Sequence, residues 1–144
     1  MNKIVLDTNI LIYSKQSASP YYTTTTNKIV ELSKAGNTLI LCPQVLREFH
    51  KVLTTPATAN GFGLKPVAAM LEIKNLESTY SLVLENSNQF DIWKSIVEKY
   101  SVSGKAVHDA NIYAFMKSQS IIDILTFNVK DFKRYQPDII IHTI

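Results

Sequence analysis

Four carboxylates and one amide are spaced along the chain so that together they could bind a metal ion. Asp7 follows the apolar run KIVL, Glu48 lies in PQVLREFHKV, and Asp109 lies in KAVHDANIYAFM. Asn128 and Asp131 both lie in TFNVKDF. Carboxylates that meet at one place repel each other, which raises their pKa values unless a cation compensates. All-oxygen ligands suit hard divalent cations, so a meeting of these side chains would predict a Mg²⁺ or Mn²⁺ site.

Each acid also has an ordinary structural use. Asp7 can cap the helix that follows it, and Asp109 can interact favourably with the dipole of its own helix. Asp131 can cap a short helix in DFKRY, and Glu48 can lie at the solvated boundary of a helix. These uses predict no common location for the four side chains, whereas a cation site requires one.

Other ligand types are poorly placed for a metal site. The histidines are His50, His108 and His142. His108 points about 100° away from its neighbour Asp109 on a helix, so we expect it at the surface or behind the ligands. The single cysteine, Cys42, lies in the apolar run LILCP and is expected in the core; it allows no internal disulfide and no cysteine-based zinc site.

Asp7, Asp109 and Asp131 stand near the ends of predicted strands or helices, and Glu48 lies within a predicted helix. Short apolar runs at 3–6, 38–42, 80–85, 121–127 and 138–144 predict strands. The first four runs are apolar on both faces, as in parallel strands that helices cover. Helical patterns between them predict βαβ units, and therefore a parallel sheet with helices on both faces. These predicted helices are Thr8–Ser14, Tyr22–Ala35, Pro43–Leu53, Leu64–Glu77, Ser87–Tyr100 and Lys105–Ser118.

Some element boundaries depend on polar residues. The threonines Thr23–Thr26 are poor helix formers, which predicts a late start for their helix. Segment 54–66 contains two prolines, two glycines and an Asn-Gly pair, and is either an ordered surface loop near an opening or a plain connector. Asn86 or Ser87, and Ser103, are the expected N-caps of the helices that follow them.

The sheet prediction gives the acids a common location. Ligands of an open parallel sheet bind beyond the carboxyl ends of its strands. Asp7, Asn128 and Asp131 share that edge, and the helix that carries Glu48 begins there. Asp109 lies in the first turn of its own helix.

Size and composition limit the class of protein. The chain has 144 residues, of which 46% are hydrophobic, so we expect one domain over residues 1–144. No run approaches the ~18 apolar residues of a membrane span, and the N-terminus shows no secretory signal pattern, so we expect a cytoplasmic protein. The formal charge of +3 is compatible with nucleic-acid binding without requiring it.

Four segments resemble, in order and spacing, the motifs of PIN-domain ribonucleases: VLDTNILIY, LREFHKV, VHDANIYAF and LTFNVKDF. The resemblance runs from Ile4 to about Arg134 and is strongest to VapC-type toxins of bacterial type II toxin–antitoxin pairs. It implies a three-layer α/β/α sandwich with a mostly parallel central sheet. It also implies a Mg²⁺- or Mn²⁺-dependent endoribonuclease that forms homodimers and is wrapped by a cognate antitoxin.

The resemblance assigns roles to individual residues. Asp7, Glu48 and Asp109 match the metal-binding acids, and Asp131 matches a further catalytic acid. Asn128 stands where many members have aspartate; its amide can orient water but adds no negative charge, which leaves a second metal ion open. The residues that match polar positions holding the acids or a metal-bound water are Thr8, Asn9, Thr126 and Asn128.

The expected reaction is metal-assisted hydrolysis of RNA. The ion polarises the scissile phosphate and lowers the pKa of a bound water, which attacks in line. By resemblance, the products carry 5′-phosphate and 3′-hydroxyl ends. Tyr21, Tyr22 and Phe62 could stack on unpaired bases, although such residues more often pack against other side chains. The cations expected to dock phosphates, or else to form a solvated surface, are Arg47, Lys51, Lys105, Lys130, Lys133 and Arg134.

Two other protein classes fit the sequence poorly, and two other PIN-domain roles stay open. A response-regulator receiver domain needs an aspartate after its third strand, where this chain has LVLENSN. A haloacid-dehalogenase phosphatase needs Asp-x-Asp, but Asn9 occupies the second position. An RNA-processing PIN nuclease outside a toxin–antitoxin pair, or an inactive RNA-binding PIN module, stays open. A short neighbouring gene for a DNA-binding protein with an amphipathic tail would favour the toxin.

Overall fold

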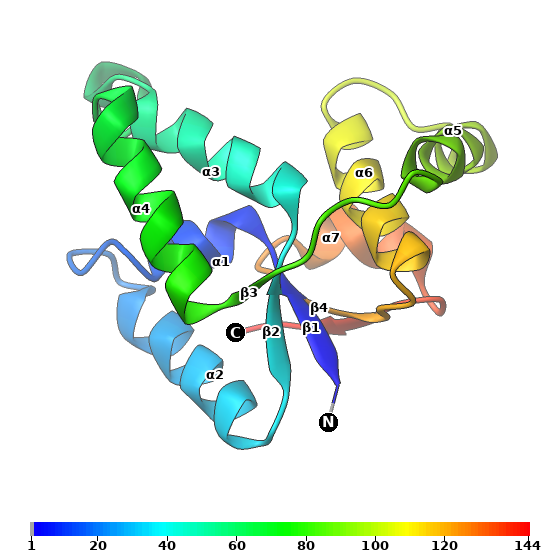
Figure 1. The fold of residues 1–144 in the computed structure, drawn as a ribbon, viewed down its shortest axis with the longest axis horizontal. Helices are drawn as coiled ribbons and strands as arrows, with labels where there is room; N and C mark the ends of the chain where they lie inside the picture. The colour runs from blue at the N-terminus through cyan, green and yellow to red at the C-terminus, as the bar shows by residue number, and fades with distance from the viewer. Residues whose placement is uncertain (1) are drawn as a thin grey trace.

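Five short strands form the centre of the fold over the described residues, 2–144, and all four pairings between them are parallel. This arrangement is seen in a computed structural model of the chain (Figure 1). The strand order is β3-β2-β1-β4-β5, so the apolar strand β1 lies in the middle. The strands are β1 (Lys3–Leu6), β2 (Thr38–Leu41), β3 (Ser81–Leu82), β4 (Asp123–Leu125) and β5 (Ile140–His142).

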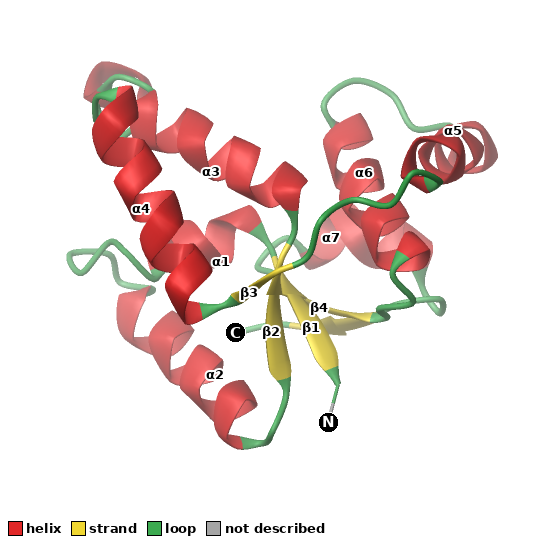
Figure 2. Ribbon diagram, in the orientation of Figure 1, coloured by secondary structure: helices red, strands yellow, loops and turns green. Residues whose placement is uncertain are grey.

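Helices cover both faces of the sheet, which completes three layers. Figure 2 shows α1, α2 and α4 on one side of the strands, and α5, α6 and α7 on the other. The prediction of an α/β fold with a mostly parallel sheet is therefore confirmed. The helices are α1 (Thr8–Tyr13), α2 (Tyr22–Lys34), α3 (Pro43–Thr54), α4 (Pro66–Thr79), α5 (Gln89–Tyr100), α6 (Ala106–Ser118) and α7 (Val129–Phe132), with 3₁₀ turns at Ala57–Ala59 and Lys133–Tyr135.

Two helices owe their positions to their apolar patterns. Helix α3 starts with Pro43 directly after β2 and buries one stripe, which includes Val45, Phe49 and Leu53. Helix α6 buries five consecutive residues, 112–116, because it lies between the sheet and α5.

Several predicted boundaries were wrong in detail. Helix α2 begins at Tyr22 without a late start; the hydroxyls of Thr24 and Thr26 donate to backbone carbonyls one turn earlier. The cap residues of α5 and α6 are Asn88 and Lys105, and neither makes a side-chain capping bond. The predicted N-caps Asn86, Ser87 and Ser103 are therefore not used, and the predicted strands 80–85, 121–127 and 138–144 are longer than β3, β4 and β5.

The loop between α3 and α4 is held by backbone hydrogen bonds. Phe62 N donates to Val52 O at 3.2 Å, and Leu64 N donates to Leu53 O at 2.8 Å. A Cβ atom on Gly61 would lie 2.0 Å from Thr55 O, so only glycine fits there. The loop is thus ordered and packed on the end of α3.

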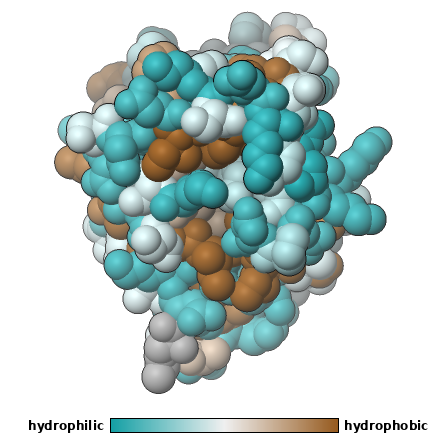
Figure 3. Space-filling model, turned by 90° about the vertical axis from the view of Figure 1, so that its right-hand side faces the viewer, coloured by the Kyte–Doolittle hydropathy of each residue, from teal (hydrophilic) through white to brown (hydrophobic). Residues whose placement is uncertain are grey.

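Within residues 2–144, no helix combines the length and the apolar character that crossing a membrane requires. Figure 3 shows the side of the molecule that carries α5, α6 and α7, where apolar residues form separate patches among polar ones.

Candidate active site

Asp7 is a buried carboxylate at the carboxyl end of β1. Its side chain is 3% exposed. Oδ1 accepts a hydrogen bond from Thr8 N at 2.7 Å, so Asp7 does cap α1. Oδ2 accepts from Thr126 Oγ1 at 2.6 Å and from Asn9 Nδ2 at 3.3 Å. Thr126 follows β4, which pairs with β1, so the sheet itself brings these residues together.

Glu48 lies one and a half turns into α3 and is held on both oxygens. Oε2 accepts from Thr8 Oγ1 at 2.6 Å, and Oε1 accepts from Gln44 Nε2 at 3.2 Å. Thr8 thus connects Glu48 and Asp7, since its backbone N–H binds the aspartate and its hydroxyl binds the glutamate. Thr8, Asn9 and Thr126 together therefore supply the donors that contact the carboxylates of Asp7 and Glu48, beside Gln44.

A chain of amides supports Glu48 from the far side. Gln44 Oε1 accepts from Asn111 Nδ2 at 3.0 Å, and Asn111 Oδ1 accepts from Gln89 Nε2 at 3.1 Å. Gln89 is 4% exposed and also donates to Glu85 at 3.2 Å. These contacts join α3, α6 and α5 behind the acids.

This amide chain was not predicted from the sequence. Gln44 stands four residues before Glu48 on one helix, a spacing that brings side chains together and could have identified it. Asn111 and Gln89 gave no comparable signal, because their partners are distant in the sequence.

Asp109 and Asp131 lie in the first turns of α6 and α7. Asp109 is half-buried, and Asp131 is exposed. Among residues 2–144, no hydrogen-bond donor contacts either carboxylate. Their oxygens are therefore free to bind a cation or a water.

Two of the four acids, Asp7 and Asp109, have raised pKa values. Burial raises the pKa of Asp7 to about 6; hydrogen bonds from Thr126 and Thr8 oppose this, and the charges of Glu48 and Asp131 add to it. Burial also raises the pKa of Asp109 to about 7, and the charges of Asp7, Asp131 and Glu48 raise it further, while Lys105 opposes them. The charges of the other acids thus act on both Asp7 and Asp109.

The donor set fits a hard divalent cation better than zinc. The described part of the chain contains no ready-made cluster of three or more Asp, Glu, His or Cys side chains in a metal-binding arrangement. Mg²⁺ keeps several waters and is usually held by one or two carboxylates, so it suits acids that lie near each other without touching. His108 is exposed at the surface, as expected.

The remaining predicted residues differ in their surroundings. The Asn128 side chain is exposed, and its backbone N–H donates to Thr126 Oγ1 at 2.8 Å. Arg47 forms an ion pair with Glu85 at 3.1 Å, which raises the pKa of Arg47 and leaves it less available to a phosphate. The other predicted phosphate-docking cations are all exposed: Lys51, Lys105, Lys130, Lys133 and Arg134.

Comparison with known proteins adds a family and a set of similar folds. The family model of the PIN domain matches residues 4–136. No curated protein sequence matches the chain.

Several solved structures have similar folds. A chain of Rickettsia felis VapBC2, bound to a promoter DNA fragment, is 18% identical with a TM-score of 0.72 over 99% of this chain and 98% of that one. A chain of VapBC-1 from nontypeable Haemophilus influenzae is 20% identical with a TM-score of 0.66, over 98% and 97%. Mycobacterium tuberculosis VapC20, described as a sarcin-ricin loop cleaving toxin, is 15% identical with a TM-score of 0.63, over 91% and 94%.

Proposed function

We propose that this chain, which belongs to the PIN-domain family, is a Mg²⁺- or Mn²⁺-dependent endoribonuclease and the toxin of a toxin–antitoxin pair. The observation that supports the nuclease is the position of Asp7 at the carboxyl end of β1, with Glu48, Asp109 and Asp131 near enough to act on it or be acted on by it. The raised pKa values of Asp7 and Asp109 indicate a negative charge that the protein itself leaves uncompensated.

Asp7, Glu48 and Asp109 are the proposed ligands of the cation, partly through water. A divalent ion bound there would polarise an oxygen of the scissile phosphate and lower the pKa of a bound water. Thr126 and Thr8 keep the carboxylates of Asp7 and Glu48 oriented, and the hydrogen bonds of both threonines to Asp7 favour its ionised form.

The other site residues act on water and on the RNA backbone. Asp131, exposed and without a hydrogen-bond donor in the described chain, orients the attacking water and accepts its proton on a carboxylate oxygen. Asn128 assists by orienting that water through its amide. The proposed phosphate-docking residues, in order of position, are Lys51, Lys105, Lys130, Lys133 and Arg134, with Arg47 released from Glu85 on binding.

The proposed protein partners are an antitoxin and a second copy of the chain. Similar structures were solved as VapBC complexes, which supports an antitoxin. A cleft of about 850 Å³ lies between α2 and α4, with Ile29, Leu76 and Tyr80 among its lining residues, and could accept an apolar segment of that partner. This assignment implies a cytoplasmic protein, because its RNA target and antitoxin are found there.

Two alternatives remain in the same family. An RNA-processing nuclease outside a toxin–antitoxin pair would use the same site without an antitoxin. An inactive RNA-binding module is disfavoured, since the chain retains Asp7, Glu48 and Asp109.

The test is a cleavage assay on total RNA. We expect cleavage with Mg²⁺ or Mn²⁺, none with EDTA, and none from Glu48→Gln in either condition. Glu98→Gln, which alters an exposed acid on α5, should cleave like the parent. Full cleavage in EDTA would refute metal dependence, and inhibition by the product of a neighbouring short gene would distinguish a toxin from a processing nuclease.

A further inference from the structure

Three aromatic rings from separate segments pack together beside the acids. Tyr13 ends α1, Tyr21 immediately precedes α2, and Phe127 follows β4. The ring centroids are 5.1 Å apart for Tyr13 and Tyr21, 4.9 Å for Tyr13 and Phe127, and 5.6 Å for Tyr21 and Phe127. Their planes are tilted or edge-to-face, a favourable geometry that fixes each ring against the other two.

This aromatic cluster is joined to the buried acid by a short hydrogen-bonded path. Phe127 N donates to Asn9 Oδ1 at 3.2 Å, and Asn9 Nδ2 donates to Asp7 Oδ2 at 3.3 Å. Tyr13 stands four residues after Asn9 on α1, and therefore on the same face of that helix. The cluster thus flanks the carboxyl edge next to Asp7.

Tyr21 is the exposed member of the cluster. Its side chain is 48% exposed, while Tyr13 and Phe127 are half-buried beneath it. Within residues 2–144, its hydroxyl has no hydrogen-bond partner, so the ring is held by ring packing alone. A planar ring that is exposed yet already fixed loses little conformational freedom when a flat ligand stacks on it.

We propose that Tyr21, supported by Tyr13 and Phe127, stacks on an unpaired nucleobase of the RNA next to the scissile phosphate. The inference rests on the proposed ribonuclease function and specifies its substrate class. A base in a duplex is covered on both faces by its neighbours, so a stacking site selects an unpaired strand or loop. Stacking needs only the π-face, so the site tolerates different bases at that position.

The test is a thermodynamic cycle between the ring and the base. Short single-stranded RNAs with one abasic nucleotide, moved along the strand, are tested with the parent and with Tyr21→Leu. Both kcat/KM for cleavage and the dissociation constant by fluorescence anisotropy are measured. Tyr21→Phe, which keeps the ring, and Phe90→Leu, which changes an exposed aromatic residue on α5, serve as comparisons.

At one position, we expect the abasic nucleotide to weaken RNA binding and cleavage by the parent by about tenfold, and those by Tyr21→Leu by less than about twofold. The effect on Tyr21→Leu is smaller because this variant has already lost the stacking interaction that the missing base removes. Tyr21→Phe should recover most of the parent's preference, and Phe90→Leu should behave like the parent. Matching melting temperatures of the parent and Tyr21→Leu would show that the folds agree. If Tyr21→Leu unfolds, Tyr21→Ile replaces it in the same cycle.

The outcomes separate this inference from the proposed function. Cleavage by the parent with no coupling between Tyr21 and any base would overturn the stacking site and leave the nuclease intact. Coupling in the binding assay without cleavage would support the stacking site and overturn the nuclease. Equal affinity of the parent for paired and unpaired versions of one RNA would also overturn the stacking site.

Discussion

At the scale of single residues, Thr126 shows how the sheet controls the charge of Asp7. Its hydroxyl donates to Asp7 Oδ2 at 2.6 Å and accepts from Asn128 N at 2.8 Å, and the side chain is fully buried. Removing a donor from a buried carboxylate leaves charge without compensation, and that costs more free energy than an ordinary hydrogen bond contributes.

Thr126→Val therefore tests this contact, because valine has nearly the same shape without the hydroxyl. At pH 7.5 we expect the free energy of unfolding to fall by about 1–3 kcal/mol, and the pKa of Asp7 to rise further. RNA cleavage should fall with it. Thr126→Ser keeps the hydroxyl and is the control. Urea unfolding and a cleavage assay are the measurements; equal behaviour of Val and Ser variants would contradict the assigned role.

The raised pKa values also predict a pH dependence. In the unfolded chain both carboxyls titrate near 3.8, whereas in the folded metal-free protein they titrate at about 6 for Asp7 and about 7 for Asp109. Between these values the folded state binds more protons, so their contribution to stability is present at low pH and is lost as pH rises from about 4 to 7.

Asp109→Asn isolates part of this contribution. We expect the stability of the metal-free parent, relative to Asp109→Asn, to decrease steadily from pH 4.5 to 7.5. Parent cleavage with Mn²⁺ should increase over the same range, because protons compete with the cation. Thermal melts at five pH values test the first statement. A stability difference that stays constant or increases with pH would show that Asp109 does not have a raised pKa.

At the scale of helices and strands, the amide chain through Asn111 keeps α3, α5 and α6 in register behind Glu48. Asn111→Ala removes two hydrogen bonds at once, leaving Gln44 Oε1 without its donor and Gln89 Nε2 with Glu85 as its one remaining acceptor among residues 2–144. We expect a loss of about 1–3 kcal/mol in the free energy of unfolding, with weaker cleavage because Gln44 no longer fixes Glu48.

The matched control is Asn75→Ala, which truncates an exposed asparagine on α4. A double variant with Gln44→Ala should lose less stability than the sum of the two single variants, since both break one network. Urea unfolding of the parent, the two single variants and the double variant measures this. Additive losses of stability would indicate that Asn111 and Gln44 are not coupled.

The sequence predicts those elements whose signals are local. Strand β1 ends where an apolar run meets Asp7, and α3 begins at a proline, so both were located correctly. The predicted strand 80–85 has only two residues in β3, because an edge strand pairs on one side over the length that its neighbour allows.

Some site residues likewise have local sequence signals, whereas others meet only through contacts between distant segments. Asp7, Asp109 and Asp131 were candidates because each stands beside a strand or helix end that its own neighbours define, whereas Glu48, inside α3, was assigned through the motif LREFHKV. The amide chain could not be predicted, because Gln44 and Asn111 are 67 residues apart and meet only through packing. The aromatic cluster likewise joins three segments, so only its exposed member Tyr21 gave a sequence signal.

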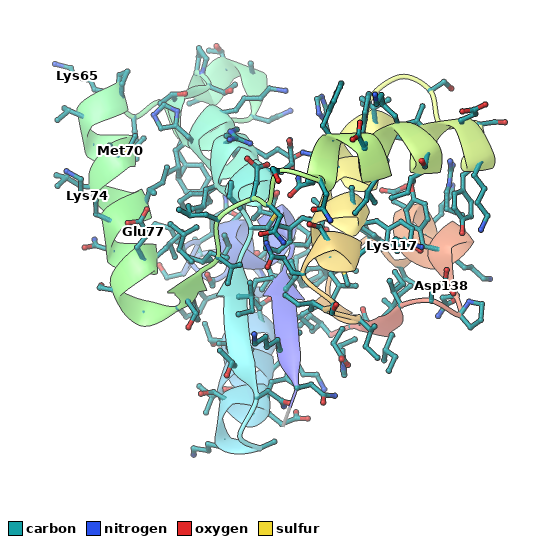
Figure 4. The ribbon with its side chains drawn as sticks, turned by 45° about the vertical axis from the view of Figure 1, so that its right-hand side comes forward. Lys65, Met70, Lys74, Glu77, Lys117 and Asp138 are labelled. Atoms are coloured by element: carbon teal, nitrogen blue, oxygen red, sulfur yellow. The ribbon has the colours of Figure 1, made fainter. Side chains whose placement is uncertain are left out.

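At the scale of the whole molecule, the outer face of α4 suggests association. Val67, Met70 and Leu71 are exposed there, and Val30 is exposed on α2. Figure 4 shows Met70 on α4 between Lys65 and Lys74, two lysines that project outward along this helix. Large apolar side chains grouped on one helix face are typical of an interface.

We therefore expect a homodimer at micromolar concentration in sedimentation experiments. Leu71→Glu should shift the population toward monomer, because it places a charge within the apolar face. Leu84→Glu, at an exposed leucine outside α4, should leave the mass unchanged. A parent that stays monomeric across the concentration range would refute the dimer.

The central claim, that the converging acids bind a catalytic divalent cation, is tested most directly by thermal melts of the parent and Asp109→Asn with and without Mn²⁺. A ligand at a hundredfold excess over its Kd stabilises the folded state by about 2.7 kcal/mol, which corresponds to a rise of roughly 5–10 °C for a chain of this size. We expect that rise in the parent and a much smaller one in Asp109→Asn, whose metal-free form should melt no lower than the parent. Equal shifts in both proteins, or none in the parent, would contradict the claim.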